Sequence, residues 1–501
     1  MRTVCINGRD VVHYYILQSG GDNHNGSAGD ATTAITISGR EEIIAESDRR
    51  RDCISIVEAG LAAADPAMFI PRYVREDRIC TPDPGVTVRL DDYNGVYTVA
   101  FGKAADSMTR AANGILQDRL SGGVITIPRG SRSAIRGRKF RIFNAGHPVP
   151  DKASVRAAKE SIKFLRARRS GDLVIFLISG GGSSLLALPD GITLGQKVHM
   201  TNLLLKCGAP IREINTVRSA LSGVKGGRLA GHLRCDAVSL IMSDVEGDDV
   251  ASIASGPTYL GEAADGKDGR YGAALDVIAR YGLSKKADKA VVDCLFKKAQ
   301  AQRDGPSESA GSGAGRMMGN YVIARNADCL EAMVAAAKRL GYGPSDSTPL
   351  QVFGDIKEAA DAVYGEIPPD GRRCVIFGGE STIKVLGRGV GGRNQEMVLR
   401  LLKKSQRMRG AAAQGRKRRR DRLVIASAGT DGIDGNSINA GAIAENEIVD
   451  IRLVNDAIRN SDSGGFFERR KRSESGGAMP PSLIRTGPTH TNLMDVGVVL
   501  T

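Results

Sequence analysis

The sequence predicts an α/β protein built from two three-layer α/β/α domains with mainly parallel sheets. Three observations lead to this fold class. The 501 residues exceed what a single hydrophobic core usually organises. Short apolar runs alternate with longer segments of helical periodicity. The 62 glycines, set against 4% aromatic residues, favour many tight turns between strands and helices.

The chain is expected to begin with a poorly ordered extension, because residues 1–46 are polar and rich in turn-forming residues. Residues 47–66 then predict an amphipathic helix, since their apolar residues recur near helical spacing. A Ser-Asp pair opens this segment and an Asp-Pro pair closes it, which is typical of helix ends.

An N-terminal α/β domain is predicted over residues 47–297. Its strands are nearly continuous in apolar residues, which predicts a parallel sheet covered by helices on both faces. After the first helix the elements follow in this order: VYTVAFGKAADSMTRAANGIL (strand, turn, helix), GGVITIPRG (strand), SVRAAKESIKFLRARR (helix), DLVIFLISGGGSS (strand, turn), TLGQKVHMTNLLLKCG (helix) and CDAVSLIMSDVEGDD (strand).

A second α/β series is predicted over residues 320–501, after a low-complexity linker or insertion at 298–319. Two surface insertions are expected to interrupt it, at 403–422 and 459–480. Its elements are NYVIARN, DCLEAMVAAAKRLGYG, CVIFGGEST, RNQEMVLRLLKK, RLVIASAGTDG and NLMDVGVVL.

Composition excludes several classes of protein. The eight cysteines contain no CxxC pair, so we expect reduced thiols and no zinc site. The longest purely apolar run, LVIFLI, is far shorter than a membrane-spanning helix, so no membrane partner is expected. The net charge of +14 is concentrated in 403–422, which holds ten basic residues and one acidic residue.

A glycine-rich loop directly follows the strand DLVIFLI. Bare backbone amides and hydroxyl donors at the carboxyl end of a parallel strand suit an anion, and phosphate is the expected one. A tight turn without a ligand is the alternative. The residues of this loop are Ser179, Gly180, Gly181, Gly182, Ser183 and Ser184.

Two basic side chains occupy similar loops. Lys103 lies just after a strand, at the start of a helix, where a cation is useful if an anion binds between it and the amides. A solvated lysine in the first turn of a helix is the alternative. His147, in the loop NAGHPVPD, is as consistent with a structural hydrogen bond as with a ligand contact.

Four acids gather after a later strand in SDVEGDD: Asp244, Glu246, Asp248 and Asp249. Carboxylate oxygens of this kind hold Mg²⁺ beside substrate phosphates, and Asp244 is favoured as a ligand. Helix capping explains one of the four acids better than all of them. Asp431 and Asp434 follow the strand RLVI in the same manner, as substrate or metal ligands or as formers of Asx-turns.

Several catalytic motifs are absent from the sequence: the P-loop, the G-x-S-x-G elbow and the H-E-x-x-H zinc motif. One G-x-G-x-x-G occurs at 387–392, but the acid expected about 20 residues later is missing. This argues against a dinucleotide site.

Taken together, the motifs GKAA, NAGHPVPD, LISGGGSSLLALP, NTVRSALSGVKGGRLA, SDVEGDD, ASGPT, GGEST, GGRNQE and SAGTDGIDG resemble one family. This is the family of glycerate 2-kinases with a C-terminal MOFRL domain, some members of which are labelled hydroxypyruvate reductases. The resemblance covers residues 50–501 apart from the insertions. Only His490, near the C-terminus, stands where a small residue is expected.

The resemblance implies transfer of the ATP γ-phosphate to the 2-hydroxyl of D-glycerate, with Mg²⁺. The active site would lie in a cleft between the two domains, the first of them Rossmann-like. Lys103 and Arg393 would be catalytic and would also bind substrate, together with Arg218 and Asp431. Residues 179–184 and Asp244 would bind the nucleotide, and Asp244 and Asp248 the metal. These roles fit phosphoryl transfer, which depends on positioning and on neutralising charge.

The alternatives are an NAD(P)H-dependent hydroxypyruvate reductase and, from another class, a polyanion- or nucleic-acid-binding protein acting through its basic insertion. We do not expect nucleic acid to be the partner, because aromatic stacking platforms are missing. A monomer or homodimer in the cytoplasm is expected, with mitochondria as the alternative location. Lys225 and Arg228 are expected to add positive field near Arg218.

Overall fold

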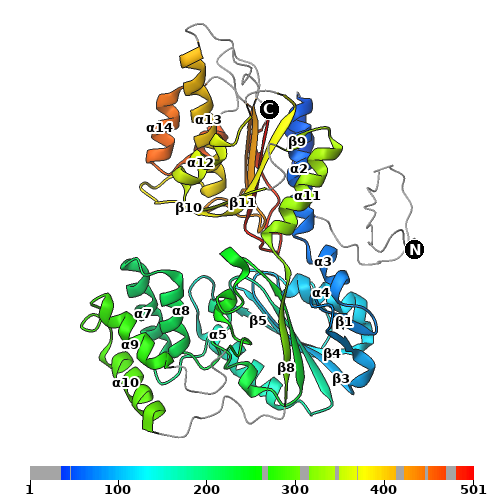
Figure 1. The fold of residues 1–501 in the computed structure, drawn as a ribbon, viewed down its shortest axis with the longest axis vertical. Coiled ribbons are helices and arrows are strands. Elements are labelled where there is room, and N and C mark those ends of the chain that lie inside the picture. Colours follow the sequence, from blue (N-terminus) through cyan, green and yellow to red (C-terminus); the bar gives the residue numbers. More distant parts are fainter. Residues whose placement is uncertain are drawn as a thin grey trace. The chain divides into compact units, whose positions relative to one another are not determined.

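The computed structural model describes residues 35–45, 47–261, 269–304, 315–344, 349–368, 371–412, 423–445, 449–469 and 481–501 (Figure 1). Residues 1–34 of the predicted extension lie outside this part of the chain, as do 305–314, 413–422 and 470–480 of the predicted linker and insertions. The remaining parts of these predicted segments include helical residues, since α10 continues to Asp304, α13 to Ala412 and α15 to Arg469.

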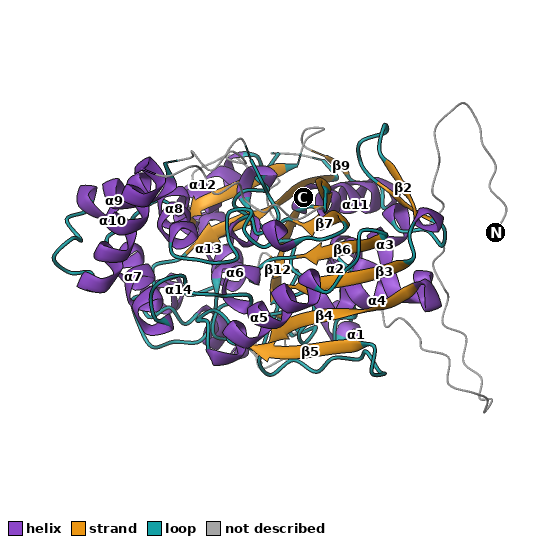
Figure 2. Cartoon of the chain, turned by 90° about the horizontal axis from the view of Figure 1, so that it is seen from below, coloured by secondary structure: helices purple, strands orange, loops and turns teal. Residues whose placement is uncertain are grey.

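The first large sheet has six strands, all parallel, in the order β5-β4-β3-β6-β7-β8. Figure 2 shows several of these strands side by side in orange. This confirms the parallel sheet predicted from the continuous apolar strands. The strands are β3 (Gly95–Phe101), β4 (Leu120–Pro128), β5 (Phe140–Ala145), β6 (Asp172–Ile178), β7 (Asp236–Met242) and β8 (Met317–Ala324).

Both faces of this sheet are buried, as strand β6 demonstrates. Its residues alternate between two apolar clusters, with Leu173, Ile175 and Leu177 in one and Val174 and Phe176 in the other. Because successive strand residues point to opposite faces, the sheet is the middle of three layers. The helices that contact it include α3 (Pro66–Tyr73), α4 (Ala105–Leu116) and α5 (Lys152–Arg166).

Four further helices pack around an apolar cluster of their own: α7 (Leu194–Lys206), α8 (Ile211–Ala220), α9 (Arg270–Arg280) and α10 (Lys289–Asp304). The short helix α6 (Gly182–Leu185) follows β6, and a two-stranded antiparallel hairpin joins β1 (Arg78–Cys80) to β2 (Thr87–Arg89). The short helix α1 (Arg40–Ile44) precedes α2.

The second large sheet has seven strands and is mixed, whereas a mainly parallel sheet was predicted. β9 and β10 are parallel to β11, but the C-terminal strand β15 runs antiparallel to both of its neighbours, β11 and β12. β12, β13 and β14 also pair antiparallel. The strands are β9 (Gly343–Pro344), β10 (Leu350–Asp355), β11 (Arg373–Thr382), β12 (Val424–Gly429), β13 (Gly441–Glu445), β14 (Leu483–Ile484) and β15 (Asp495–Leu500).

Helices cover both faces of this mixed sheet as well. In β15, Val496 and Val498 join one apolar cluster and Val499 joins another. One face contacts α2 (Asp48–Ala63) and α11 (Asn326–Arg339). The opposite face contacts α12 (Ile356–Gly365) and α13 (Arg393–Ala412), next to α14 (Ile451–Arg459) and α15 (Ser463–Arg469). The α/β class with two layered sheets is therefore confirmed.

The sequence predicted the ends of helix α2 but not the sheet on which the helix packs. Its predicted ends are confirmed, since the Ser47 hydroxyl accepts a hydrogen bond from Arg50 N, and Pro66 begins the next helix. Although α2 lies within the range predicted for the N-terminal domain, it packs on β12 and β15 of the second sheet (Figure 1). Residues Ala34–Thr501, which include both sheets, form one compact unit.

Among the described residues, no single helix is long and apolar enough to cross a membrane. The bent pair α2 and α3 reaches that length and apolar composition only when the two helices are taken together.

Candidate active site

The loops that follow β3 and β6 lie side by side, because these strands pair in parallel and end together at Phe101 and Ile178. Lys103 N donates to Gly180 O at 2.8 Å, and Ala104 N donates to the Ser179 hydroxyl at 3.0 Å. The sheet therefore brings the predicted Lys103 to the predicted glycine-rich loop.

Close packing explains two of the glycines in this loop. A Cβ at Gly180 would lie 1.9 Å from Asp244 Oδ2, so only glycine lets that carboxylate approach the backbone. Gly181 has a positive φ of 77°, and a Cβ there would lie 2.8 Å from His147 Nε2. In the described part of the chain, the amides of Gly180, Gly181 and Ser183 have no protein acceptor. These amides remain available to an anion.

The Ser183 hydroxyl is surrounded by donors. Lys225 Nζ donates to it at 2.6 Å, Arg218 Nη2 also donates to it, and Ser255 Oγ lies 2.7 Å away. Burial lowers the pKa of Arg218 and, more strongly, that of Lys225. Of these residues, Arg218 was a predicted site residue and Lys225 was expected only to add positive field. Ser255 was missed as a site residue, although it lies within the motif ASGPT.

Asp244 and Asp248 have different surroundings. Asp244 accepts a hydrogen bond from Asn492 Nδ2 at 3.1 Å beside the glycine-rich loop. Burial, with the negative charge of Glu380, raises the pKa of Asp244 to about 6. Asp248 instead forms a 3.8 Å ion pair with Arg325. Among the described residues, no group of three or more His, Cys, Asp or Glu side chains could hold a metal ion.

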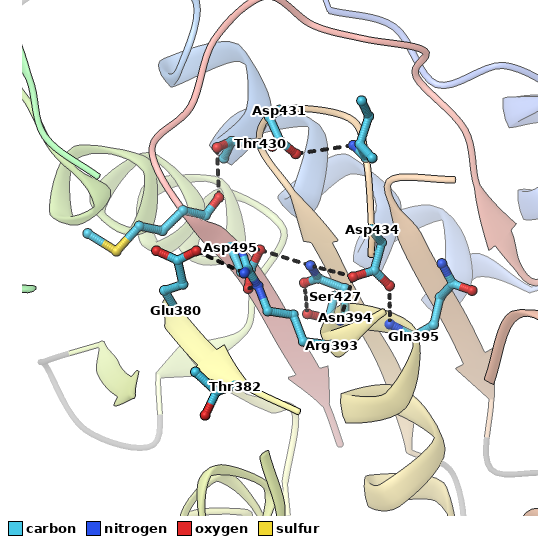
Figure 3. A network of polar contacts seen from close by, with 12 residues as sticks. Glu380, Thr382, Arg393, Asn394, Gln395, Ser427, Thr430, Asp431, Asp434 and Asp495 are labelled. Carbon is cyan, nitrogen blue, oxygen red and sulfur yellow. Dashed lines mark hydrogen bonds and ion pairs between the residues drawn. The ribbon is translucent and has the colours of Figure 1, made fainter. Parts of the chain in front are cut away.

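Arg393, the first residue of α13, is held by two carboxylates of the second sheet (Figure 3). Its Nη2 donates to Asp495 Oδ1 at 3.2 Å, and its Nη1 lies 2.8 Å from Glu380 Oε1. Burial disfavours the charged guanidinium, but the Asp495 carboxylate outweighs burial and raises the pKa of Arg393. Neither carboxylate was predicted. An acid opening the apolar strand DVGVVL was the available signal for Asp495.

Asp434 is fully buried and caps the start of α13 (Figure 3). Its carboxylate accepts hydrogen bonds from Asn394 N at 3.0 Å and Gln395 N at 2.8 Å. Burial raises the pKa of Asp434 to about 7, against the effect of these bonds. Asp434 therefore fixes the helix turn that carries Arg393. Its carboxylate does not form an Asx-turn, because the amides that it binds are distant in the sequence.

Lys103 Nζ and Asp431 Oδ2 form an ion pair at 2.8 Å. Lys103 follows β3 of the first sheet, and Asp431 follows β12 of the second. Burial, and then the charge of Lys103, lowers the pKa of His147. The ion pair joins predicted residues that are 328 positions apart in the sequence.

The glycines of the G-x-G-x-x-G segment at 387–392 pack closely against neighbouring loops of the same half of the protein. A Cβ at Gly389 would lie 2.4 Å from Asp462 Cβ, and one at Gly392 would lie 2.2 Å from Asp434 Oδ1. Glycine is thus required here by the protein itself, which agrees with the sequence argument against a dinucleotide site.

His490 has a positive φ of 56°, a backbone conformation that glycine adopts most readily. Its carbonyl accepts a hydrogen bond from the Ser107 hydroxyl at 2.5 Å. This backbone conformation is a physical reason to expect glycine, the smallest residue, at this position.

The fold and the site define an α/β enzyme with buried cations beside a glycine-rich loop. Residues 52–296 match the domain of unknown function DUF4147, and residues 373–495 match the MOFRL family. A glycerate 2-kinase from Pyrococcus horikoshii is 31% identical over 473 residues, covering 90% of this chain and 97% of the relative. The chain therefore belongs to the glycerate kinase family, as its motifs indicated.

Two further proteins are similar to this chain. A putative hydroxypyruvate reductase from Agrobacterium vitis is 33% identical, with 89% of this chain and 93% of the relative covered. The crystal structure of a glycerate kinase from Thermotoga maritima is 29% identical, with a TM-score of 0.67, 89% of this chain and 98% of that chain covered.

Proposed function

We propose that this chain is an ATP-dependent glycerate 2-kinase that phosphorylates the 2-hydroxyl of D-glycerate. One observation carries the proposal: the Lys103–Asp431 ion pair lies beside a glycine-rich loop that has amides without protein acceptors. Phosphoryl transfer needs cations and N–H donors around the transferring group, and little covalent chemistry from the protein. The similarity to a glycerate 2-kinase over most of both chains supports this reaction.

In the proposed reaction, the loop amides, including that of Ser183, bind nucleotide phosphates. Lys103 neutralises charge on the transferred phosphoryl group, and Arg393 binds the glycerate carboxylate with its planar fork of donors. The 2-hydroxyl oxygen forms a bond to the γ-phosphorus while the bond to the bridging oxygen of ADP breaks. Asp431, released from Lys103, accepts the hydroxyl proton.

The residues present fit Mg²⁺, because one half-buried carboxylate beside a phosphate site is a common way to hold it in kinases. Asp244 would hold the ion, together with the nucleotide phosphates. Asp248, the second predicted ligand, is paired with Arg325 and is the weaker candidate. Bound Mg²⁺ supplies charge neutralisation for the phosphates.

The direct test combines purified protein with ATP, Mg²⁺ and D-glycerate and identifies the product isomer. We expect 2-phosphoglycerate, and its loss in folded Lys103→Ala and Arg393→Ala variants. Lys152→Ala, an exposed lysine on α5, is the matched control and should be fully active. Absence of any phosphoglycerate from folded wild-type protein would overturn the proposal.

A second candidate, hydroxypyruvate reduction, follows from the name of the Agrobacterium vitis relative. Incubation of the same protein with hydroxypyruvate and NADH or NADPH, followed at 340 nm, tests it. We expect no oxidation of either nucleotide, because the glycines of 387–392 pack against the protein itself. A monomer or homodimer, a cytoplasmic location and the domain limits of the sequence analysis remain predictions.

A further inference from the structure

Two basic residues contact the hydroxyl of Ser183, and a third contacts the backbone of one of them. Lys225 Nζ donates to both the carbonyl and the hydroxyl of Ser183, each at 2.6 Å. Arg218 Nη2 donates to the same hydroxyl. Lys197 Nζ donates to the carbonyls of Arg218 and Leu221, each at 2.9 Å. The three cations are therefore tied to one another through Ser183 and the end of α8.

In the part of the chain that the structure describes, the two lysine side chains are buried without a carboxylate partner. Lys225 is 1% exposed and Lys197 is 4% exposed. Within the described ranges, no carboxylate forms an ion pair with Lys197, Arg218 or Lys225. The neighbouring Asp190 is engaged by Lys298 and Arg228. Burial disfavours the charged forms of Lys197 and Lys225 and lowers their pKa. A bound anion would offset this cost, so a cluster of basic side chains without carboxylates suits an anionic ligand.

The residues differ in how a ligand could reach them. Ser183 and Arg218 are half-buried, whereas Lys225 is fully buried. Ser255, on the other side, donates to Asn215 Oδ1 at 3.2 Å. Because Ser255 donates to Asn215, the Ser183 hydroxyl donates its only proton to Ser255, while its oxygen accepts from Lys225 and Arg218. The orientation of this hydroxyl is therefore fixed before any ligand binds.

We propose that Arg218 binds an oxyanion beside Ser183, and that Lys225 and Ser255 are positioning residues that hold the Ser183 hydroxyl against Arg218. The proposal rests on the proposed kinase function and deepens it. The ligand is a phosphate or carboxylate group, and two sources share that chemistry: the phosphates of the nucleotide and the carboxylate of glycerate. Lys225 and Ser255 are the new assignments.

The test uses the full-length protein and three variants: Ser183→Ala, Lys225→Met and Lys225→Arg. Titration calorimetry measures binding of inorganic phosphate, ADP and D-glycerate separately, and initial rates give KM for ATP and for glycerate. Lys206→Met, an exposed lysine on α7, is the matched control. Circular dichroism establishes that each variant is folded, and Ser183→Ala decides the matter if Lys225→Met does not fold.

We expect Ser183→Ala and Lys225→Met to weaken binding of one ligand about ten-fold, the size of one lost charge-assisted hydrogen bond. KM for the matching substrate should rise by a similar factor, kcat should change less, and Lys225→Arg should recover part of the loss. Weaker ADP and phosphate binding identifies the nucleotide as the source, and weaker glycerate binding identifies the carboxylate.

Unchanged binding and unchanged KM in folded variants would overturn the proposal. Failure of the proposed kinase function gives a different result. Wild-type protein would then bind phosphate and lose that binding in Ser183→Ala, while producing no phosphoglycerate.

Discussion

Lys103 and Asp431 form a 2.8 Å ion pair between the loop after β3 and the loop after β12. Each comes from a different sheet, so the contact brings the two halves of the proposed site together. An anionic substrate that binds Lys103 has to compete with Asp431 for the same ammonium group. The pair is therefore the contact that substrate binding is expected to change.

Replacement of Lys103 by Met should reduce kcat by about a thousand-fold, because a cation at the transferring phosphoryl group stabilises the transition state by several kcal/mol. Steady-state kinetics with ATP and D-glycerate measures the effect. Lys152→Met should retain wild-type kcat, since Lys152 is exposed on α5. A Lys103→Met enzyme with near-normal kcat would remove Lys103 from the reaction.

Arg393→Lys should lower kcat/KM for glycerate by about a hundred-fold, although the charge is kept. Lysine cannot contact Asp495 and Glu380 together and still present a planar fork to a carboxylate. Arg388→Lys, at an exposed position in the loop that precedes α13, is the control. Equal activity of both variants would show that the geometry of the guanidinium does not matter.

Gly180→Ala should destabilise the protein by about 1–3 kcal/mol and reduce activity, because its Cβ would lie 1.9 Å from Asp244 Oδ2. Gly114→Ala is the matched control, since nothing lies within 4 Å of its Cβ on helix α4. That change should stabilise the helix by about 0.5–1 kcal/mol. Urea unfolding measures both effects, and equal shifts in the two variants would contradict the steric argument.

The rate at low pH should depend on Asp244, whose pKa is raised to about 6 by burial and by Glu380. Below this pH the carboxyl is protonated and no longer suits Mg²⁺, so kcat/KM for ATP should fall as pH decreases through about 6. Glu380→Gln removes a nearby negative charge and should shift this fall in kcat/KM to lower pH. If the fall occurs at the same pH in Glu380→Gln, a group other than Asp244 causes it.

Stability should decrease with rising pH because of Asp434. Its folded pKa of about 7 lies above that of an unfolded aspartate, which is about 4. Between these values the folded protein binds a proton that the unfolded chain does not, so the free energy of unfolding falls as pH rises. Asp434→Asn keeps one capping acceptor and removes this titration.

Urea unfolding at pH 5 and pH 8 tests the role of Asp434. Wild type should lose on the order of 1–3 kcal/mol more than Asp434→Asn between these pH values. The same loss in both proteins would show that Asp434 does not carry the pH dependence.

Local patterns predicted much of the fold because they report burial directly. The continuous apolar run of β6 required a strand covered on both faces, and its alternating residues do enter two clusters. The Ser-Asp and Asp-Pro signals placed the ends of α2 correctly, because capping is a property of neighbouring residues.

Strand direction in the second sheet could not be predicted in this way. The sequence of β15 is a short apolar run, and such a run does not indicate whether the strand pairs parallel or antiparallel. In the structure β15 lies between β11 and β12 and is antiparallel to both. This orientation places Asp495 opposite Gly379 and Gly429, at the edge where β11 and β12 end. The acid that holds Arg393 therefore depends on pairing between strands that are distant in the sequence.

By itself, the sequence determined the alternation of strands and helices, the glycine-rich loop after β6 and the motifs of the glycerate kinase family. These features are encoded by residues close together in the chain. Only the tertiary structure decided that α2 covers the second sheet, that Lys103 meets Asp431, and that Arg218 and Lys225 meet at Ser183. Such contacts depend on which faces pack and on which strand ends share an edge, and no local periodicity records either choice.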